Sequence, residues 1–294
     1  MYKIMFLNNW GGSSESMIER YRFQTPGNDG IWDQLRATTN PAEADFFIIM
    51  DGLPARVSEN AIPTAKKIYF QREPVEILKY HKFVEDKALF KGSFDRHYSP
   101  STWHIKKSFM EIRDLPRPVK TKKLSCIMSG KAMTPAQRQR VFVLHGLKER
   151  FPDVDIFGKG LDPKIFGASY KGALEYNQFC KFRGLIDYEY SYAAENSSHE
   201  NYFTEKLVDC FLTWTKPLYW GCPNIDRYFP SGSYTWVDIY DKRAVDRIIE
   251  ETGEPVDYEA LREARELVLF KYNLWPSIQN IIANYRDHIG EGIS

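Results

Sequence analysis

Residues 194–206 hold the side chains best suited to chemistry, and the segment changes character twice. Aromatic residues precede it, small polar residues fill its centre, and from Tyr202 onwards apolar residues recur at the spacing of one helix face. This pattern predicts a strand, a polar loop, and a helix whose first turn carries Glu205 and Lys206. A helix N-terminus favours an anion, because its N–H groups are unpaired and its end of the dipole is positive. A phosphate beside Lys206 is therefore one interpretation, and two solvated first-turn residues are the other.

Four short motifs follow one another here: Glu195-Asn196-Ser197, a single Tyr202, Thr204-Glu205-Lys206, and Lys216-Pro217-Leu218-Tyr219-Trp220-Gly221. Together they resemble the donor-site signature of the α1,3/1,4-fucosyltransferases, glycosyltransferase family 10. The resemblance is strong over residues 185–240 and weaker on either side, and the chain looks like the compact microbial or viral members. It implies an α/β, GT-B-like fold, in which two Rossmann-like domains face a cleft.

By this resemblance, four residues fall on donor-binding positions: Asn196, Tyr202, Glu205 and Lys206. Glu205 would accept hydrogen bonds from ribose or fucose hydroxyls, and Lys206 would hold phosphate. Asn196 and Tyr202 would orient the sugar or the base. The residues alone leave other interpretations open, since Tyr202 suits a core position and Asn196 suits a turn. We expect Lys206 to matter for donor binding and not for folding.

A second cation is predicted near the start of a helix over residues 135–150. The resembled family carries an arginine seven residues ahead of a helix leucine, a spacing that Arg140 and Leu147 match and Arg138 does not. A guanidinium can hold a diphosphate through two parallel hydrogen bonds, which a lysine cannot. We therefore predict Arg140 as a phosphate ligand, with a plain surface charge as the alternative.

Asp153-Val154-Asp155 has the D-x-D form used by metal-dependent glycosyltransferases. Val154, Ile156 and Gly158 alternate through this region as along a strand, which favours a structural role for the two aspartates. The resembled family has a structural segment here as well. We predict no metal site and no cofactor besides the donor substrate.

The general base is predicted at the end of a strand over residues 68–74, which carries Glu73. Strand carboxyl ends face the ligand crevice in open α/β sheets, and the resembled family has a glutamate after a hydrophobic strand at this point. Glu73 would remove the proton of the acceptor hydroxyl. A solvated strand-end glutamate is the alternative, and Asp95, His97 and His104 are weaker candidates.

Strand and helix patterns alternate along both halves of the chain, which favours parallel, doubly wound sheets. In the first half we predict strands at residues 2–8, 45–51 and 67–71, with helices at 28–37 and 75–84. In the second half we predict strands at residues 124–129 and 153–157 around the helix at 135–150.

A proline-rich, charged segment, residues 113–123, is the best linker candidate. We predict an acceptor-side domain at residues 1–117 and a nucleotide-sugar domain at residues 118–294. The second domain would include a helical tail, with helices near residues 257–271 and 275–286.

Composition limits the class of protein. Length favours about two domains, and an apolar content of 43% favours a globular chain. A net charge of +1 argues against a nucleic-acid partner. The apolar run at residues 1–8 is too short for a signal peptide or membrane anchor, so we expect no transmembrane segment and a cytoplasmic protein. The four cysteines are spread along the chain without a C-x-x-C pair, so the sequence predicts neither a zinc site nor a disulfide framework. They are Cys126, Cys180, Cys210 and Cys222.

The sequence thus predicts an inverting, metal-independent fucosyltransferase that moves L-fucose from GDP-β-L-fucose to a glycan hydroxyl, in an α1,3-type linkage as the resemblance implies. Glu73 would deprotonate the oligosaccharide acceptor, while Arg140 and Lys206 stabilise the departing GDP. Two alternatives stay open: a GT-B transferase of another nucleotide sugar, and a non-catalytic homologue that binds glycans or nucleotide sugars. No oligomeric state is predicted.

Overall fold

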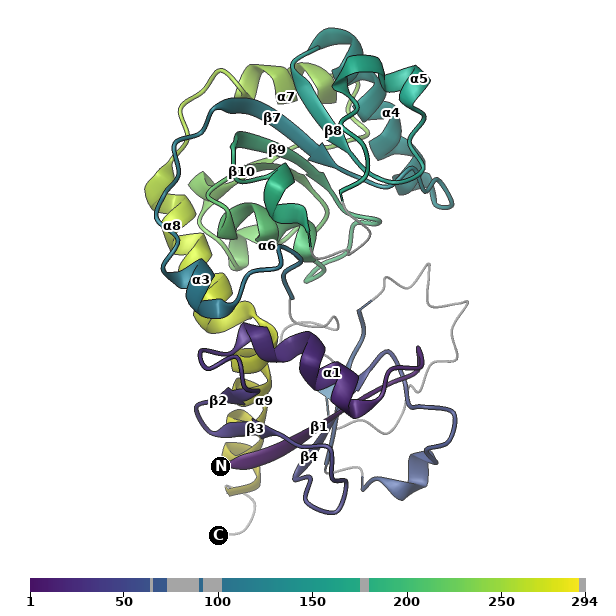
Figure 1. The fold of residues 1–294 in the computed structure, drawn as a ribbon, viewed down its shortest axis with the longest axis vertical. Helices are drawn as coiled ribbons and strands as arrows, with labels where there is room; N and C mark the ends of the chain where they lie inside the picture. The colour runs from purple at the N-terminus through teal and green to yellow at the C-terminus, as the bar shows by residue number, and fades with distance from the viewer. Residues whose placement is uncertain (64–65, 73–89, 92–101, 175–179, 291–294) are drawn as a thin grey trace. The chain divides into compact units, whose positions relative to one another are not determined.

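A computed structural model describes residues 1–63, 66–72, 90–91, 102–174 and 180–290. The chain forms two compact units. Unit 1 comprises Met1–Thr102, Lys107–Arg113 and Leu269–Ser294, and unit 2 comprises Trp103–Lys106 and Asp114–Val268. Both are drawn in Figure 1.

Unit 1 is built on a six-stranded sheet in the order β2-β3-β1-β4-β5-β6. All neighbours pair in parallel except β2 and β3, which form an antiparallel pair. Its strands are β1 (Tyr2–Asn8), β2 (Ile31–Trp32), β3 (Leu35–Ala37), β4 (Phe46–Met50), β5 (Lys67–Phe70) and β6 (Phe90–Lys91). Among the described residues, its α-helices are α1 (Ser14–Tyr21), α3 (Phe109–Arg113) and α9 (Leu274–Gly290).

The helix predicted at residues 28–37 is wrong, because this segment forms the β2–β3 hairpin. Trp32 pairs with Leu35 across a two-residue turn, and Asp33 in that turn has a positive φ of 43°. Gly30, just before the hairpin, also has a positive φ of 75°, a conformation that a helix does not contain. The strands predicted at 2–8, 45–51 and 67–71 are confirmed as β1, β4 and β5. The helix predicted at 75–84 lies outside the described residues.

Unit 1 includes the C-terminal helix α9, drawn in yellow in Figure 1. Trp275 lies in one buried cluster with Ile4 and Phe6 of β1, its ring centroid 5.7 Å from that of Phe6. Its indole nitrogen donates to the carbonyl oxygen of Tyr21 at 2.9 Å. Residues 269–290 therefore belong with the N-terminal unit, and not with the second domain as predicted, because the apolar stripe of α9 completes the core against β1 and α1.

Unit 2 is built on a five-stranded parallel sheet in the order β11-β10-β9-β7-β8. Its strands are β7 (Lys122–Ile127), β8 (Val154–Phe157), β9 (Tyr188–Ala194), β10 (Lys216–Trp220) and β11 (Thr235–Trp236). Its helices are α4 (Pro135–Arg150), α5 (Pro163–Phe166), α6 (Glu205–Leu212), α7 (Ala244–Glu251) and α8 (Tyr258–Leu267). The predicted strands and helices of this half are confirmed.

The proline-rich segment is anchored in unit 2, and the division falls at residues 113 and 114 instead of 117 and 118. The ammonium group of Lys120 donates to the carbonyl oxygens of Ile186 and Thr213 at 2.9 and 2.7 Å, and to the hydroxyl of Thr215. Burial lowers the pKa of Lys120 to about 7. These contacts fix the segment to the amino end of β10 and to the loop before β9.

Candidate functional site

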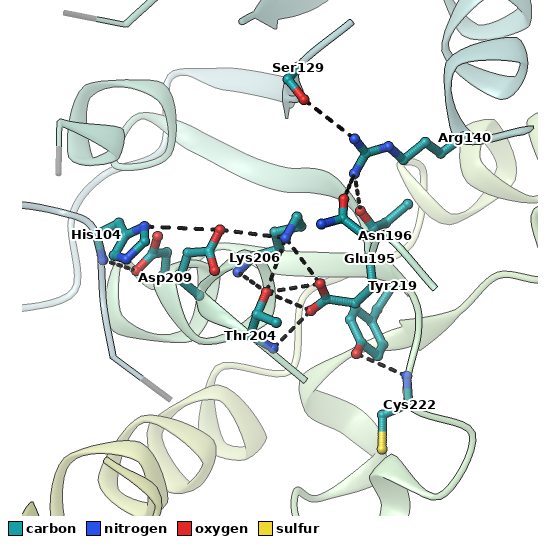
Figure 2. Close-up of polar contacts among 12 residues, drawn as sticks. His104, Ser129, Arg140, Glu195, Asn196, Thr204, Lys206, Asp209, Tyr219 and Cys222 are labelled. Atoms are coloured by element: carbon teal, nitrogen blue, oxygen red, sulfur yellow. Dashed lines mark hydrogen bonds and ion pairs between the residues drawn. The ribbon is translucent and has the colours of Figure 1, made fainter. Parts of the chain in front are cut away.

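The loop from Glu195 to Thr204 joins the carboxyl end of β9 to the start of α6, and Glu195 ties its two ends together. The Glu195 side chain is fully buried and accepts from the backbone N–H of Thr204 at 2.8 Å and from its hydroxyl at 2.9 Å. Thr204 in turn caps α6, since its hydroxyl accepts from the backbone N–H of Lys206. These contacts are drawn in Figure 2. Ligands of open parallel sheets bind at such strand ends.

Glycine is needed at position 221, on the loop after β10. An added Cβ there would lie 2.4 Å from Cγ of Glu195 and 2.5 Å from the Tyr219 hydroxyl. That hydroxyl accepts from the backbone N–H of Cys222 at 3.0 Å. The glycine that ends the Lys216–Gly221 motif therefore makes room for the buried carboxylate that begins the first motif.

Lys206 is held by protein oxygens at its ammonium group. Nζ lies 3.1 Å from Oε2 of Glu195, 3.2 Å from the Thr204 hydroxyl and 3.5 Å from Oε1 of Glu205. Burial alone would lower the pKa of Lys206, but the carboxylates of Glu195 and Glu205 outweigh it and the pKa is raised. The sequence left two interpretations of Lys206 open, a phosphate ligand and a solvated first-turn residue, and the structure places two carboxylates beside its ammonium group.

Glu205 and Asp209, one helix turn apart, face a lysine that the sequence did not single out. Lys181 Nζ lies 2.9 Å from Oε1 of Glu205 and 3.4 Å from Oδ2 of Asp209. Asp209 accepts at Oδ1 from the backbone N–H of His104 at 2.8 Å, and the His104 ring nitrogen Nδ1 lies 4.0 Å from Oε1 of Glu205.

The pKa values of these two carboxyl groups, Glu205 and Asp209, are shifted in opposite directions. Burial alone would raise the pKa of Glu205, but the charges of Lys181, Lys206 and His104 hold it well below its usual range. Burial raises the pKa of Asp209 to about 7, although Lys181 opposes this. At neutral pH, Glu205 is therefore an acceptor only, while Asp209 is near its midpoint. Both line a small pocket together with Lys181, Lys206, Ser191 and Tyr192.

Arg140 of α4 brings a third buried cation to the same strand ends, with 2% of its surface exposed. Its Nη1 donates to Oδ1 of Asn196 at 2.9 Å and to the carbonyl oxygen of Ala194 at 3.3 Å, and its Nη2 lies 3.5 Å from the Ser129 hydroxyl. Its Nε–H is buried without a hydrogen-bond partner. In the part of the chain that the structure describes, no carboxylate lies within 4 Å of this guanidinium.

Asn196 is held by Arg140, whereas Tyr202 is 2% exposed and its ring lies against His199. Tyr202 therefore has the buried position of its alternative interpretation. Arg138 donates to the carbonyl oxygens of Ala132 and Met133 outside this cluster.

Glu73, with Asp95 and His97, lies outside the described residues. The remaining base candidate, His104, lies in unit 2. Its backbone N–H donates to Asp209, and its carbonyl oxygen accepts from the backbone N–H of Lys181.

The D-x-D aspartate Asp155 has structural partners. It accepts from the Tyr188 hydroxyl at 2.7 Å and forms ion pairs with Lys122 at 2.9 Å and Lys171 at 3.1 Å. In the ranges that the structure describes, no three His, Cys, Asp or Glu side chains gather as metal ligands would. In those ranges there is also no helix with the length and apolar character to cross a membrane.

Comparison with known proteins supports the sequence resemblance. Residues 118–250 match the family model "Glycosyltransferase family 10 (fucosyltransferase) C-term". An alpha-(1,3)-fucosyltransferase of Helicobacter pylori is 31% identical over 90 residues, which cover 31% of this chain and 18% of that relative. The chain thus matches less than a fifth of the relative's length.

Two solved structures resemble the whole chain. An alpha1,3-fucosyltransferase superposes with a TM-score of 0.52 at 17% identity, over 97% of this chain and 89% of the other. An alpha-glucosyltransferase, solved with UDP and a 13-mer DNA containing an A:G mismatch, gives 0.56 at 11% identity, over 96% and 99%. At these identities the likeness concerns the fold alone. The predicted α/β fold of the GT-B type is confirmed.

Proposed function

We propose that this chain belongs to glycosyltransferase family 10, whose model residues 118–250 match, and that it transfers L-fucose from GDP-β-L-fucose to a glycan hydroxyl, with inversion and in an α1,3-type linkage. The observation that carries the proposal is the Arg140 guanidinium. Burying a charge is costly unless an opposite charge or hydrogen bonds compensate it. The described neighbours of Arg140 are neutral oxygens, and its Nε–H has no partner. An anion at the strand ends would supply both the opposite charge and a hydrogen-bond acceptor for Nε–H.

The anion we assign to Arg140 is the diphosphate of the donor. A guanidinium suits it because two N–H groups can meet two phosphate oxygens in parallel. As the sugar leaves, negative charge grows on GDP, and a fixed cation stabilises that charge without having to reorient. Lys206 is the second and weaker cation of this site, because its ammonium group already serves Glu195, Thr204 and Glu205.

Glu205 and Asn196 complete the donor contacts that we propose. An ionised carboxylate accepts hydrogen bonds from sugar hydroxyls, and Glu205 lines the pocket beside Lys206. Asn196 has its oxygen bound to Arg140, which leaves its amide N–H groups to donate. Tyr202 is a buried residue of the same loop as Asn196, so we assign it to holding this loop beside the donor.

The reaction we propose is a single displacement. Glu73 removes the proton from the acceptor hydroxyl, the new bond forms at the anomeric carbon, and GDP leaves with the electron pair. Arg140 and Lys206 take the place that a divalent metal has in other transferases. The engagement of Asp155 with two lysines and Tyr188 supports this, since it gives that aspartate of the D-x-D sequence a structural role.

The experiment is a donor screen with the purified chain. GDP-fucose, GDP-mannose and UDP-glucose are each incubated with a panel of disaccharides, and products are identified by mass spectrometry and NMR. We expect GDP release and an α-linked fucosylated product with GDP-fucose alone. Transfer from UDP-glucose, or tight GDP-fucose binding without turnover on any acceptor, would contradict the proposal.

A further inference from the structure

Lys181 lies outside every motif of the sequence but in direct contact with the donor-site carboxylate. It begins the short helix Lys181–Gly184, and its backbone N–H donates to the carbonyl oxygen of His104 at 3.1 Å. Its side chain is 16% exposed, so its charge is largely withdrawn from water. Nζ lies 2.9 Å from Oε1 of Glu205 and 3.4 Å from Oδ2 of Asp209.

The two oxygens of Glu205 differ in their surroundings. Oε1 faces Lys181 at 2.9 Å, Lys206 at 3.5 Å and the His104 ring at 4.0 Å. Among the residues that the structure describes, no side chain or backbone N–H has a hydrogen bond or ion pair with Oε2. Glu205 is partly exposed and lines the pocket, so this second oxygen is available to a ligand.

We propose that Lys181 is a positioning residue for the donor, which holds Glu205 ionised and directs its second oxygen to a hydroxyl of the transferred sugar. This rests on the proposed function, which brings a nucleotide sugar to the pocket. An ionised carboxylate accepts and cannot donate, so the pair selects a ligand that presents hydroxyl donors.

The surrounding charges explain why Lys181 is needed. Lys206 is shared with the fully buried Glu195, and Asp209 lies one turn from Glu205 on the same helix. Without Lys181, Glu205 and Asp209 would repel each other with only Lys206 and His104 to offset them. Glu205 would then bind a proton more readily and lose the fixed contact that orients it.

The first test compares two ligands that differ by the sugar. Lys181→Met keeps most of the apolar stem and removes the charge, and calorimetry gives its affinity for GDP-fucose and for GDP. We expect GDP-fucose affinity to fall about tenfold, as for a weakened hydrogen bond to a charged group, and GDP affinity to stay within about twofold. Lys181→Arg should recover most of the loss. Lys171→Met is the matched control, because Lys171 is also ion-paired, with Asp155 at 3.1 Å, and should change neither affinity.

The second test needs no nucleotide. The carboxyl carbon of Glu205 is followed by NMR titration, assigned through Glu205→Gln, in the wild type and in Lys181→Met. Its midpoint should move up in the variant and return in Lys181→Arg. If Lys181→Met does not fold, the double variant with Asp209→Asn, which removes the second carboxylate, takes its place in both tests.

An unchanged Glu205 midpoint would overturn the inference, as would equal losses of GDP and GDP-fucose affinity. If the wild type bound neither ligand, the proposed function would fail, and the Glu205 titration would still decide whether Lys181 controls this carboxylate.

Discussion

Removing Lys206 is expected to destabilise unit 2 more than it weakens donor binding. The Lys206→Ala change leaves Glu195, which is fully buried, without the cation at 3.1 Å. Breaking a buried ion pair on one side typically costs about 3–5 kcal/mol. Two contacts lower this figure, since Glu195 keeps the N–H and hydroxyl of Thr204 at 2.8 and 2.9 Å. Water can also enter the vacated space, because the Lys206 side chain is 18% exposed.

We therefore expect a loss of about 2–3 kcal/mol in the free energy of unfolding, which is at or below the lower limit of that range. For a domain of this size each kcal/mol lowers Tm by about 2–4 °C, so Tm should fall by about 5–10 °C. GDP affinity should fall by less than about tenfold, since the ammonium group is already shared among three protein oxygens.

The assay is calorimetric, with unfolding and GDP titration measured on the same samples. The double variant Lys206→Ala, Glu195→Gln separates the two effects, because it removes the unpaired charge and keeps an oxygen for Thr204. It should regain most of the lost stability and none of the lost GDP affinity. A single variant with wild-type Tm, or a double variant less stable than the single one, would refute the reasoning.

Four other outcomes follow from the site. Arg140→Lys keeps the charge but not the paired N–H groups, so GDP affinity in calorimetry should fall about tenfold or more. Glu73→Gln should lower kcat by about 10²–10⁴ with GDP-fucose affinity preserved, and a folded variant with wild-type turnover would remove Glu73 from the mechanism. Turnover should survive exhaustive chelation within a small factor, and loss restored by manganese would contradict fixed cations. Burial raises the pKa of Asp209 to about 7, so between about pH 4 and 7 the folded state holds a proton that the unfolded state has lost. The stability of the protein should therefore fall as the pH rises through this range. The Tm of Asp209→Asn should fall less over the same range.

Much of unit 2 could be predicted from the sequence because its patterns are local. The strand predicted from the aromatic segment before residue 194 and the helix predicted after it are confirmed as β9 and α6, and the Pro135–Arg150 helix has both ends as expected. The Thr204 cap is a local signal as well. By contrast, the spacing of Ile31 and Leu35 fits one face of a helix, which led to the wrong prediction at residues 28–37. The segment forms a hairpin because the chain turns at Asp33.

The partners of the site residues could not be predicted, since they come together through the tertiary fold. Glu195 lies eleven residues before Lys206, and nothing in the spacing indicates that the loop returns to place them 3.1 Å apart. His104 reaches Asp209 across 105 residues, and Lys181 reaches Glu205 across 24. Lys181 belongs to none of the motifs of the sequence, and an isolated lysine is typical of any protein surface.

The balance of charge in this cluster would let the proposed donor site both hold and release a diphosphate. Lys181 and Lys206 are offset by Glu195 and Glu205, and Asp209, whose pKa burial raises to about 7, adds only part of a further negative charge. Arg140 is thus the cation whose described contacts are all neutral. The donor diphosphate, as we propose, meets one guanidinium beside a compensated network, and not three free cations. Such a site stabilises its ligand most as negative charge grows on the leaving group. After transfer, it has no excess positive charge that would retain GDP.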